Sequence, residues 1–430
     1  MGKLPPTTSG RARLLAATAL LAGVTGPVHS ANWEWASRAT LNANWNNNPA
    51  LVVDSRDPES TFRMVAGLAG NLVRLADGST LEFRPRVTRD YYPDEKFKDL
   101  ESTDFFLPGR YNQQRLRSSW SLGWNATRQN VLSDEDTLAD EPVTSLNADD
   151  TVYRLRLSPA VSWIMTQRDQ LSLLTSLSKT EFDKEFTGRA DTEAAVISVS
   201  YSHSLDQNQS VGFSVFRTQF RSERLDRLRL DGLPPLVREL ENETTSDSFS
   251  LDYRRRISER SRVFVRFGLQ ESETQSTQTI VETGESGETP ILTFESTTYE
   301  IGFDRETLRG SWEASINRGV SPATNGSPQD RYEIRFGGRL DFSKKLSGSL
   351  KLRARQQQRL ILSEQGSESG KDRFYSANVR AAWKLDRKWR LTATYRFRFR
   401  QPDSASENSA TARSDQVLLG FTYVWKPLRR

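Results

Sequence analysis

The sequence predicts an all-β protein, a transmembrane antiparallel up-and-down β-barrel of about 18 strands (about 16–18), with short periplasmic turns and long extracellular loops. Three observations predict this fold. Apolar and polar side chains alternate with a period of two along most of the chain, helical periodicity is nearly absent, and short connections alternate with long polar ones. A strand with lipid on one side and an aqueous lumen on the other requires this pattern.

The first 30 residues have the features of a cleaved secretory signal peptide. Three basic residues precede the apolar run at 14–26, and Val28 and Ser30 are small residues suited to a cleavage site. We therefore expect residues 1–30 to be removed and residues 31–430 to form one barrel domain in the bacterial outer membrane. Loss of three basic residues lowers the formal net charge from +5 to +2, which does not favour nucleic acid as a partner.

The alternation of side chains defines the individual strands. In residues 391–401, LTATYRFRFRQ, apolar and aromatic residues occupy the odd positions through 399, whereas threonine and arginine occupy the even positions. The same alternation is present in residues 33–45, 81–87, 152–165 and 332–342. Of the roughly 18 predicted strands, those at residues 102–112, 209–219 and 297–304 have weaker alternation. Pro85, Pro108 and Pro159 each remove a donor from the ladder, so we expect bulges there.

The connections fall into two classes that alternate along the chain. Short polar turns are expected at residues 76–79, 166–170, 205–209, 257–261, 343–347 and 385–389. Long polar loops are expected at residues 132–150, 221–245, 272–290 and 401–413. An even number of strands places both chain ends beside the short turns, at the periplasmic side. A soluble β-sandwich would seldom sustain this many strands without a linker, and a β-solenoid would show a fixed short repeat.

Arginine recurs in the polar phase of the predicted strands. An arginine that faces lipid at mid-membrane costs about 2–4 kcal/mol, so these side chains should face the lumen. The predicted lumen arginines are Arg84, Arg86, Arg154, Arg156, Arg335, Arg339, Arg353, Arg355, Arg380, Arg396 and Arg398. The planar guanidinium holds carboxylate, sulfate or phosphate in bidentate pairs, and basic rings favour anion passage. Alternatively, they only brace the lumen by pairing with inward acids: Glu82, Asp90, Asp252, Glu333 and Asp341.

The sequence contains no set of residues that indicates catalysis, so we expect no enzymatic activity and no cofactor or metal. Cysteine is absent, and beyond the signal peptide the one histidine is His203, which shares its phase with apolar neighbours and should face lipid. Acidic residues at 133–137 and 147–150 supply oxygen ligands for Ca²⁺, but neither stretch has the spacing of an EF-hand.

Several stretches resemble outer-membrane β-barrel proteins encoded beside exopolysaccharide and PEP-CTERM/exosortase systems of Gram-negative bacteria. The residues that carry the resemblance are STLEFRPRVTRDYYPDE (79–95), STDFFLPGRYN (102–112), SWSLGWNATRQNVLSDEDT (119–137) and LSPAVSWIMTQRDQLSLLTSLS (157–178). The resemblance is clearest over the first half of the chain. It implies passage or anchoring of a secreted polymer at the outer membrane, and it fixes no substrate. Unlike many outer-membrane barrels, the chain ends with KPLRR rather than a terminal aromatic residue.

Three functions are consistent with these features. The first is a non-enzymatic conduit or docking protein for an anionic exopolysaccharide, with outer-membrane lipid, lipopolysaccharide and periplasmic export components as partners. The second is a general porin for small anionic solutes. The third is a structural or adhesive barrel whose lumen is plugged. Ion conductance distinguishes the three.

Overall fold

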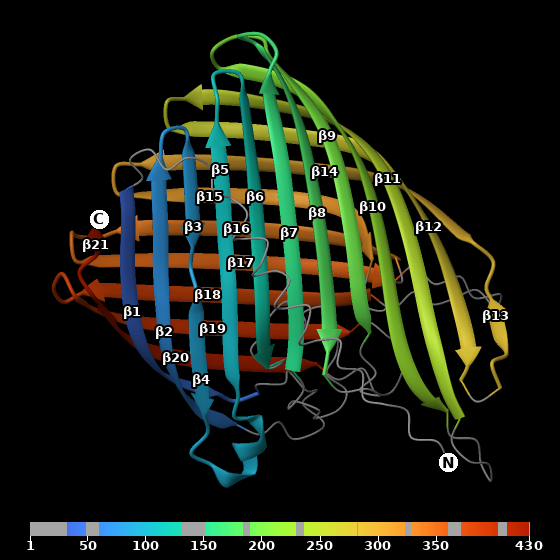
Figure 1. The fold of residues 1–430 in the computed structure, drawn as a ribbon, viewed down its shortest axis with the longest axis horizontal. Coiled ribbons are helices and arrows are strands. Elements are labelled where there is room, and N and C mark those ends of the chain that lie inside the picture. The colour runs from blue at the N-terminus through green and yellow to red at the C-terminus, as the bar shows by residue number, and fades with distance from the viewer. Residues whose placement is uncertain are drawn as a thin grey trace.

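The structure is a computed structural model and describes residues 32–48, 60–130, 151–183, 190–228, 236–281, 283–322, 328–359, 371–402 and 411–429. All its strands belong to one sheet, which closes because β1 (Asn32–Asn46) pairs with β20 (Ala412–Val424). The result is an 18-strand antiparallel barrel, so the predicted fold class is confirmed. In Figure 1 the strands of the near wall cross those of the far wall, as strands tilted around a barrel do.

Each barrel strand pairs with the strands before and after it in sequence. Between β1 and β20 the strands are β2 (Thr61–Ala76), β3 (Ser79–Phe83), β4 (Arg86–Tyr91), β5 (Thr103–Gln114), β6 (Ser118–Asn130), β7 (Thr151–Ile164), β8 (Asp169–Phe182), β9 (Asp191–Ser204), β10 (Gln209–Leu228), β11 (Leu236–Ser258), β12 (Ser261–Ile280), β14 (Leu292–Thr307), β15 (Gly310–Pro322), β16 (Pro328–Asp341), β17 (Leu346–Arg359), β18 (Lys371–Lys384) and β19 (Trp389–Pro402). Two short pieces, β13 (Ser286–Glu288) and β21 (Leu428–Arg429), pair with β12 and β1.

The three prolines interrupt the hydrogen-bond ladder without shifting its register. β3 and β4 are two halves of one strand separated by Arg84 and Pro85, and both halves pair in one register with β2. Pro108 and Pro159 also keep register with β6. The bulges predicted at these prolines are therefore wrong. The ladder bridges the gaps with proline carbonyls, because Pro85 accepts from the Gly70 N–H and Pro108 from the Arg84 N–H, both at 2.9 Å.

The six predicted short turns are present, and two more, at 115–117 and 308–309, complete the set. The Asp77–Gly78 turn places Gly78 at a φ of 68°, which glycine adopts without strain. In the turn before β19, the carboxylate of Asp386 accepts the N–H of Lys388 at 2.6 Å and that of Trp389 at 2.8 Å. These backbone donors, with the Trp389 N–H first, lower the pKa of Asp386.

The first and last barrel strands confirm the predicted arrangement of the chain ends. β1 begins and β20 ends at the side where the short turns lie, and the long connections lie at the other side. One long connection contains the 3₁₀ helix η3 (Glu95–Leu100), which Asp94 caps by accepting the Lys96 N–H. The predicted signal peptide (1–30) and the two acidic stretches (133–137 and 147–150) lie outside the described residues.

The strands β10, β11 and β12 are longer than the sequence suggested. They have 20, 23 and 20 residues, whereas a membrane strand needs about 9–11. Residues 221–245 and 272–290 were expected to be loops, and most of their described residues instead continue these strands. The reason is that Thr, Ser, Glu and Gln in these segments extend a ladder that two neighbouring strands already hold, although their composition is typical of loops.

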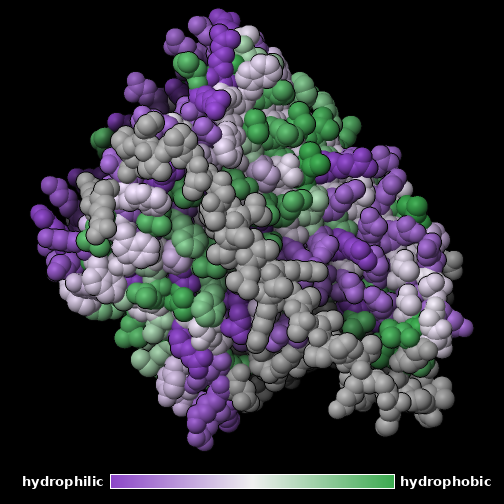
Figure 2. All heavy atoms as spheres, viewed as in Figure 1, coloured by the Kyte–Doolittle hydropathy of each residue, from purple (hydrophilic) through white to green (hydrophobic). Residues whose placement is uncertain are grey.

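Large apolar side chains are exposed on one face of the strands. Examples are Leu41, Leu68, Phe267, Ile334 and Leu419, each 50–58% exposed. Figure 2 shows hydrophobic side chains in the upper right of this surface and in smaller groups towards the lower left, with hydrophilic side chains at its left edge and on its right side. We call the face of the strands that carries these exposed apolar side chains the outer face. The opposite face lines the lumen, and we call it the inner face. Among the described residues no helix is long and apolar enough to cross a membrane.

Candidate functional site: the arginine-lined lumen

Strand β19 shows how the sequence alternation is expressed in the barrel. Leu391 and Tyr395 are exposed on the outer face, whereas Arg398 and Arg400 are only 6% and 7% exposed on the inner face. The side chains of a strand alternate between faces, so Arg396 also lies on the inner face. The inner side of a closed barrel is concave, which crowds its side chains and accounts for the burial of polar residues there.

The eleven arginines predicted for the lumen all lie in the inner phase of their strands. The register of each strand with its neighbours, read against the exposed apolar side chains, gives this assignment. They form three groups: Arg84 and Arg86 at β3–β4; Arg154 and Arg156 on β7; and Arg335, Arg339, Arg353, Arg355, Arg380, Arg396 and Arg398 on β16–β19.

The centre of the largest group is a buried glutamate. Glu333 on β16 has a fully buried side chain, and it binds Arg335 on its own strand. From β17 it accepts Arg353 Nη2 at 2.9 Å and Arg355 Nε at 3.1 Å. One carboxylate therefore orients three guanidinium groups and neutralises only one of their charges.

The neighbouring strands continue this basic wall. Arg353 on β17 and Arg398 on β19 both pair in register with Ser376 on β18, so a small hydroxyl residue lies between two arginines. Successive strands are about 4.8 Å apart, which places the two arginine backbones about 10 Å from each other. Arg380, on the same strand as Ser376, forms no salt bridge within the described residues.

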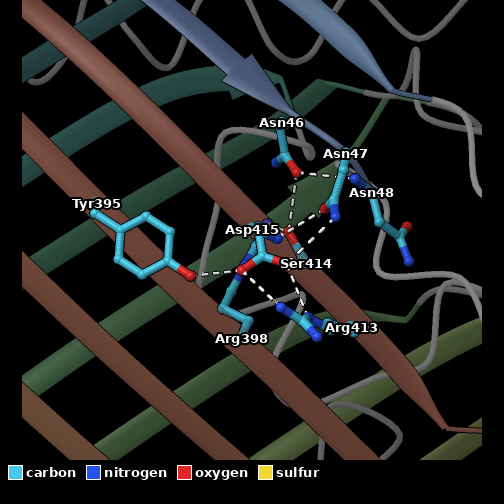
Figure 3. Close-up of polar contacts among 8 residues, drawn as sticks. All are labelled: Asn46, Asn47, Asn48, Tyr395, Arg398, Arg413, Ser414 and Asp415. Atoms are coloured by element: carbon cyan, nitrogen blue, oxygen red, sulfur yellow. Dashed lines mark hydrogen bonds and ion pairs between the residues drawn. The ribbon is translucent and has the colours of Figure 1, made fainter.

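Arg396 and Arg398 of β19 lie at the seam between β19, β20 and β1. There they donate to hydroxyl and amide oxygens. Arg398 donates to Ser414 Oγ at 3.2 Å, and Ser414 donates to Asn46 Oδ1 at 2.9 Å. Arg396 donates to Gln416 Oε1 at 3.0 Å. Figure 3 shows this seam, in which the Tyr395 hydroxyl points towards Asp415 and Asn46 lies beside Ser414. These hydroxyl and amide acceptors orient the two guanidinium groups.

The remaining predicted arginines have varied partners. Arg84 Nε donates to Glu82 at 2.7 Å, and the guanidinium carbon of Arg86 lies 3.8 Å from the centre of the Phe106 ring. Arg156 Nε donates to Ser176 Oγ at 3.1 Å. Arg339 lies 3.5 Å from Asp341, and both side chains are about half exposed. Arg154 also takes part in an interaction.

All five acids predicted to face inward are ion-paired with inward arginines, three of them with arginines named above. Asp90 binds Arg63 at 2.8 Å, and Asp252 binds Arg266 at 2.7 Å. The list of predicted lumen arginines did not include Arg63 and Arg266, nor Arg400, which binds Asp372 at 2.7 Å. Each lies in the polar phase, so the alternation alone could have located them. Around Arg63 the pattern is obscured because the apolar Val65 and Ala69 also lie in the inner phase.

His203 lies where the sequence predicted, on the outer face next to a short turn. Its Nδ1 is 2.7 Å from Asp169, which also accepts the Tyr201 hydroxyl at 2.5 Å. The hydroxyl of Thr166 also donates to Asp169. In the described part of the chain, no group of three or more His, Asp or Glu side chains is arranged to hold a metal ion.

The barrel has an apolar outer face and a polar, arginine-rich inner face. The chain is a β-barrel of the outer-membrane type. No family model matches it, and no curated protein matches it. Among solved structures, the ferric citrate transporter FecA aligns over 91% of this chain and 78% of its own, with 10% identity and a TM-score of 0.49. OpdQ of Pseudomonas aeruginosa aligns over 92% and 98%, with 9% identity and a TM-score of 0.43.

OccAB2 of Acinetobacter baumannii is similar to the same extent. It covers 92% of this chain and 98% of its own, with 8% identity and a TM-score of 0.43. At such identities none of these likenesses assigns the chain to a family. The resemblance to barrels of exopolysaccharide systems therefore stays a prediction.

Proposed function

We propose that this barrel lies in the bacterial outer membrane and serves as a conduit or docking site for an anionic polymer, an exopolysaccharide. The proposal includes outer-membrane lipid and lipopolysaccharide as surroundings and export components as periplasmic partners. The protein acts without catalysis: the basic inner face lowers the electrostatic barrier that a negatively charged chain meets in a channel.

The excess of arginine over acid on the inner face of β16–β19 carries this proposal. The inner-phase acids of these four strands are Glu333, Asp341 and Asp372. Against them stand the seven arginines of the predicted group and Arg400 on the same strands. Arginine keeps its charge at any physiological pH, so the excess positive charge persists. Ion pairs brace this wall without neutralising it.

The arrangement of the basic groups suits a chain with repeated charges. Arg353 and Arg398 flank Ser376 about 10 Å apart. Further basic groups lie above and below them in the same wall. A polymer can contact several of these groups at once, and each new contact forms as another breaks, which favours movement along the wall.

Two other functions share part of this evidence. A porin for small anions would use the same wall, with single carboxylates or phosphates in place of a chain. A structural barrel with a plugged lumen is favoured by the pairing of all five predicted acids, such as Glu333 with three arginines. Conductance separates the three: steady anion-selective current indicates the porin, current that polymer or a partner changes indicates export, and no current indicates the structural role.

The experiment is a planar-bilayer recording of the purified barrel and of the double variant Arg396→Glu, Arg398→Glu. Each charge about 8 Å from a permeating ion contributes about 0.5 kcal/mol in water. The change of four charges sums to about 2 kcal/mol, which screening at 0.1 M salt reduces to about 1 kcal/mol. We therefore expect the wild type to be anion-selective and the variant to shift towards cations by roughly fivefold per ion.

The matched control is the double variant Arg217→Glu, Arg221→Glu, which makes the same charge change on the outer face of β10. It should leave the selectivity as in the wild type. Equal selectivity of the wild type and the lumen variant would contradict the proposal.

A further inference from the structure

A second wall of the lumen, on β7–β11, differs from the arginine wall. Five serines pair in register across these strands and form one row on the inner face: Ser162, Ser172, Ser200, Ser214 and Ser250. Ser162 and Ser172 hydrogen-bond each other at 2.9 Å. The Oγ of Ser250 is buried, and within the described residues it has no hydrogen-bond partner. Ser162, Ser172 and Ser200 are part-exposed, so this end of the row can offer hydroxyls to a polar ligand.

Two apolar side chains interrupt the polar inner face beside this row. Leu174 on β8 and Phe216 on β10 both pair with Ser198 on β9, so they flank a small residue on the inner face. Leu174 is 45% exposed, although barrel strands normally turn polar side chains inward. Phe216 is part-exposed as well. An aromatic ring and an aliphatic side chain on either side of a small residue form an apolar seat within a hydroxyl-lined wall.

Leu174, Phe216 and Ser198 line a groove of about 360 Å³, together with three serines of the row: Ser172, Ser200 and Ser214. At the polar end of the groove, Asp252 accepts hydrogen bonds from Ser214 Oγ at 2.9 Å and from Arg266 Nε at 2.7 Å. Arg266 also reaches Glu300 at 3.2 Å. The groove thus combines an apolar seat, many hydroxyls that both donate and accept, and one fixed acid–arginine pair.

We propose that this groove binds a sugar ring. The C–H face of a pyranose stacks on Phe216 and Leu174, and its hydroxyls exchange hydrogen bonds with Ser172 and Ser200 of the serine row and with Asp252. A polypeptide or nucleic acid lacks this combination of an apolar ring face and a dense rim of hydroxyls. The proposal rests on the proposed function for the presence of a polymer in the lumen and adds its class: a carbohydrate chain whose acidic groups follow the arginine wall and whose rings follow the serine wall.

The test uses a neutral probe at high salt, so that the arginine wall contributes little. Maltohexaose is added to the purified full-length barrel in 1 M KCl, where the Debye length is about 3 Å, and its Kd is measured by calorimetry. We expect measurable binding to the wild type. Phe216→Ala should weaken it about tenfold, which corresponds to about 1.4 kcal/mol. Phe216→Trp, which keeps an aromatic ring, should bind within about threefold of the wild type.

The matched control is Phe267→Ala, which removes the same ring from the outer face of β12, where it is 53% exposed. It should leave the Kd unchanged. The inference is overturned if the wild type does not bind maltohexaose, if Phe216→Ala and Phe267→Ala weaken binding equally, or if an uncharged hexapeptide binds as tightly as the sugar.

The test of sugar binding and the test of the proposed function can fail independently. Bilayer recordings on the same samples report anion selectivity, which depends on the arginine wall. Selectivity without sugar binding overturns the sugar groove alone. Sugar binding without selectivity overturns the role of the arginine wall and leaves the groove in place.

Discussion

Replacement of Glu333 by glutamine should destabilise the barrel and at the same time make its lumen more basic. The side chain of Glu333 is fully buried, and its three arginine partners differ widely in exposure: 3% for Arg355, 27% for Arg353 and 54% for Arg335. The variant keeps the shape of the side chain and removes its charge. Three guanidinium groups then lack their common acid.

The magnitude follows from these exposures. The Arg355 hydrogen bond is buried and charged, so its loss costs about 1.5–3 kcal/mol. The pairs with Arg353 and Arg335 are reached by water, so each contributes about 0.2–1 kcal/mol. The sum predicts a loss of about 2–5 kcal/mol in the free energy of unfolding. The gain of one positive charge should raise anion selectivity above that of the wild type.

The assay is denaturant unfolding of the barrel in lipid vesicles, followed by tryptophan fluorescence, with the shift in midpoint converted through the m-value. Asp341→Asn is the matched control, because its pair with Arg339 is about half exposed and 3.5 Å long. It should cost less than about 1 kcal/mol. If the two variants have equal stability, the Glu333 cluster does not brace the wall, and the reasoning is refuted.

Three further outcomes follow from other contacts. Gly109→Val should destabilise by about 1–3 kcal/mol in the same unfolding assay, because a Cβ at this position would overlap the ring of Trp124; unchanged stability would contradict this packing. Asp386→Ala should lower the stability at neutral pH, because the N–H groups of Lys388 and Trp389 lose their carboxylate acceptor. Since the folded-state pKa of Asp386 is lowered, its contribution is present above its unfolded pKa and is lost as the pH falls through its folded pKa, so wild type and variant should converge only in strong acid. His203→Ala should leave ion selectivity unchanged in bilayer recordings, because its ring lies on the outer face; altered selectivity would place it in the conduction path.

The sequence predicted the barrel because its two faces meet different solvents. In β19, a lipid-facing Tyr395 next to a lumen-facing Arg396 needs no tertiary information to be assigned. The same argument placed all eleven arginines on the inner face. The partners of these arginines could not be predicted in this way. That Glu333 binds three of them depends on the register of β16 with β17, and register is set by contacts between strands.

The extent of β10–β12 and the serine wall were missed for related reasons. Serine and threonine are typical of loops as well as of strands, so segments such as 241–250 do not reveal a ladder by composition. The row from Ser162 to Ser250 consists of one residue from each of five strands, and no stretch of sequence contains it. Phe216 in the inner phase was visible in the alternation of β10, and it is the signal by which the groove could have been found.

The most direct test of the account is the accessibility of neighbouring positions on β19. The chain has no cysteine, so Tyr395→Cys and Arg396→Cys each introduce a single thiol. In proteoliposomes, a membrane-impermeant anionic thiol reagent should modify the cysteine at 396 and change the conductance, whereas the cysteine at 395 should react only with a lipid-soluble maleimide. Modification of position 395 by the impermeant reagent, with position 396 labelled from the lipid, would contradict the assignment of the arginine face to the lumen.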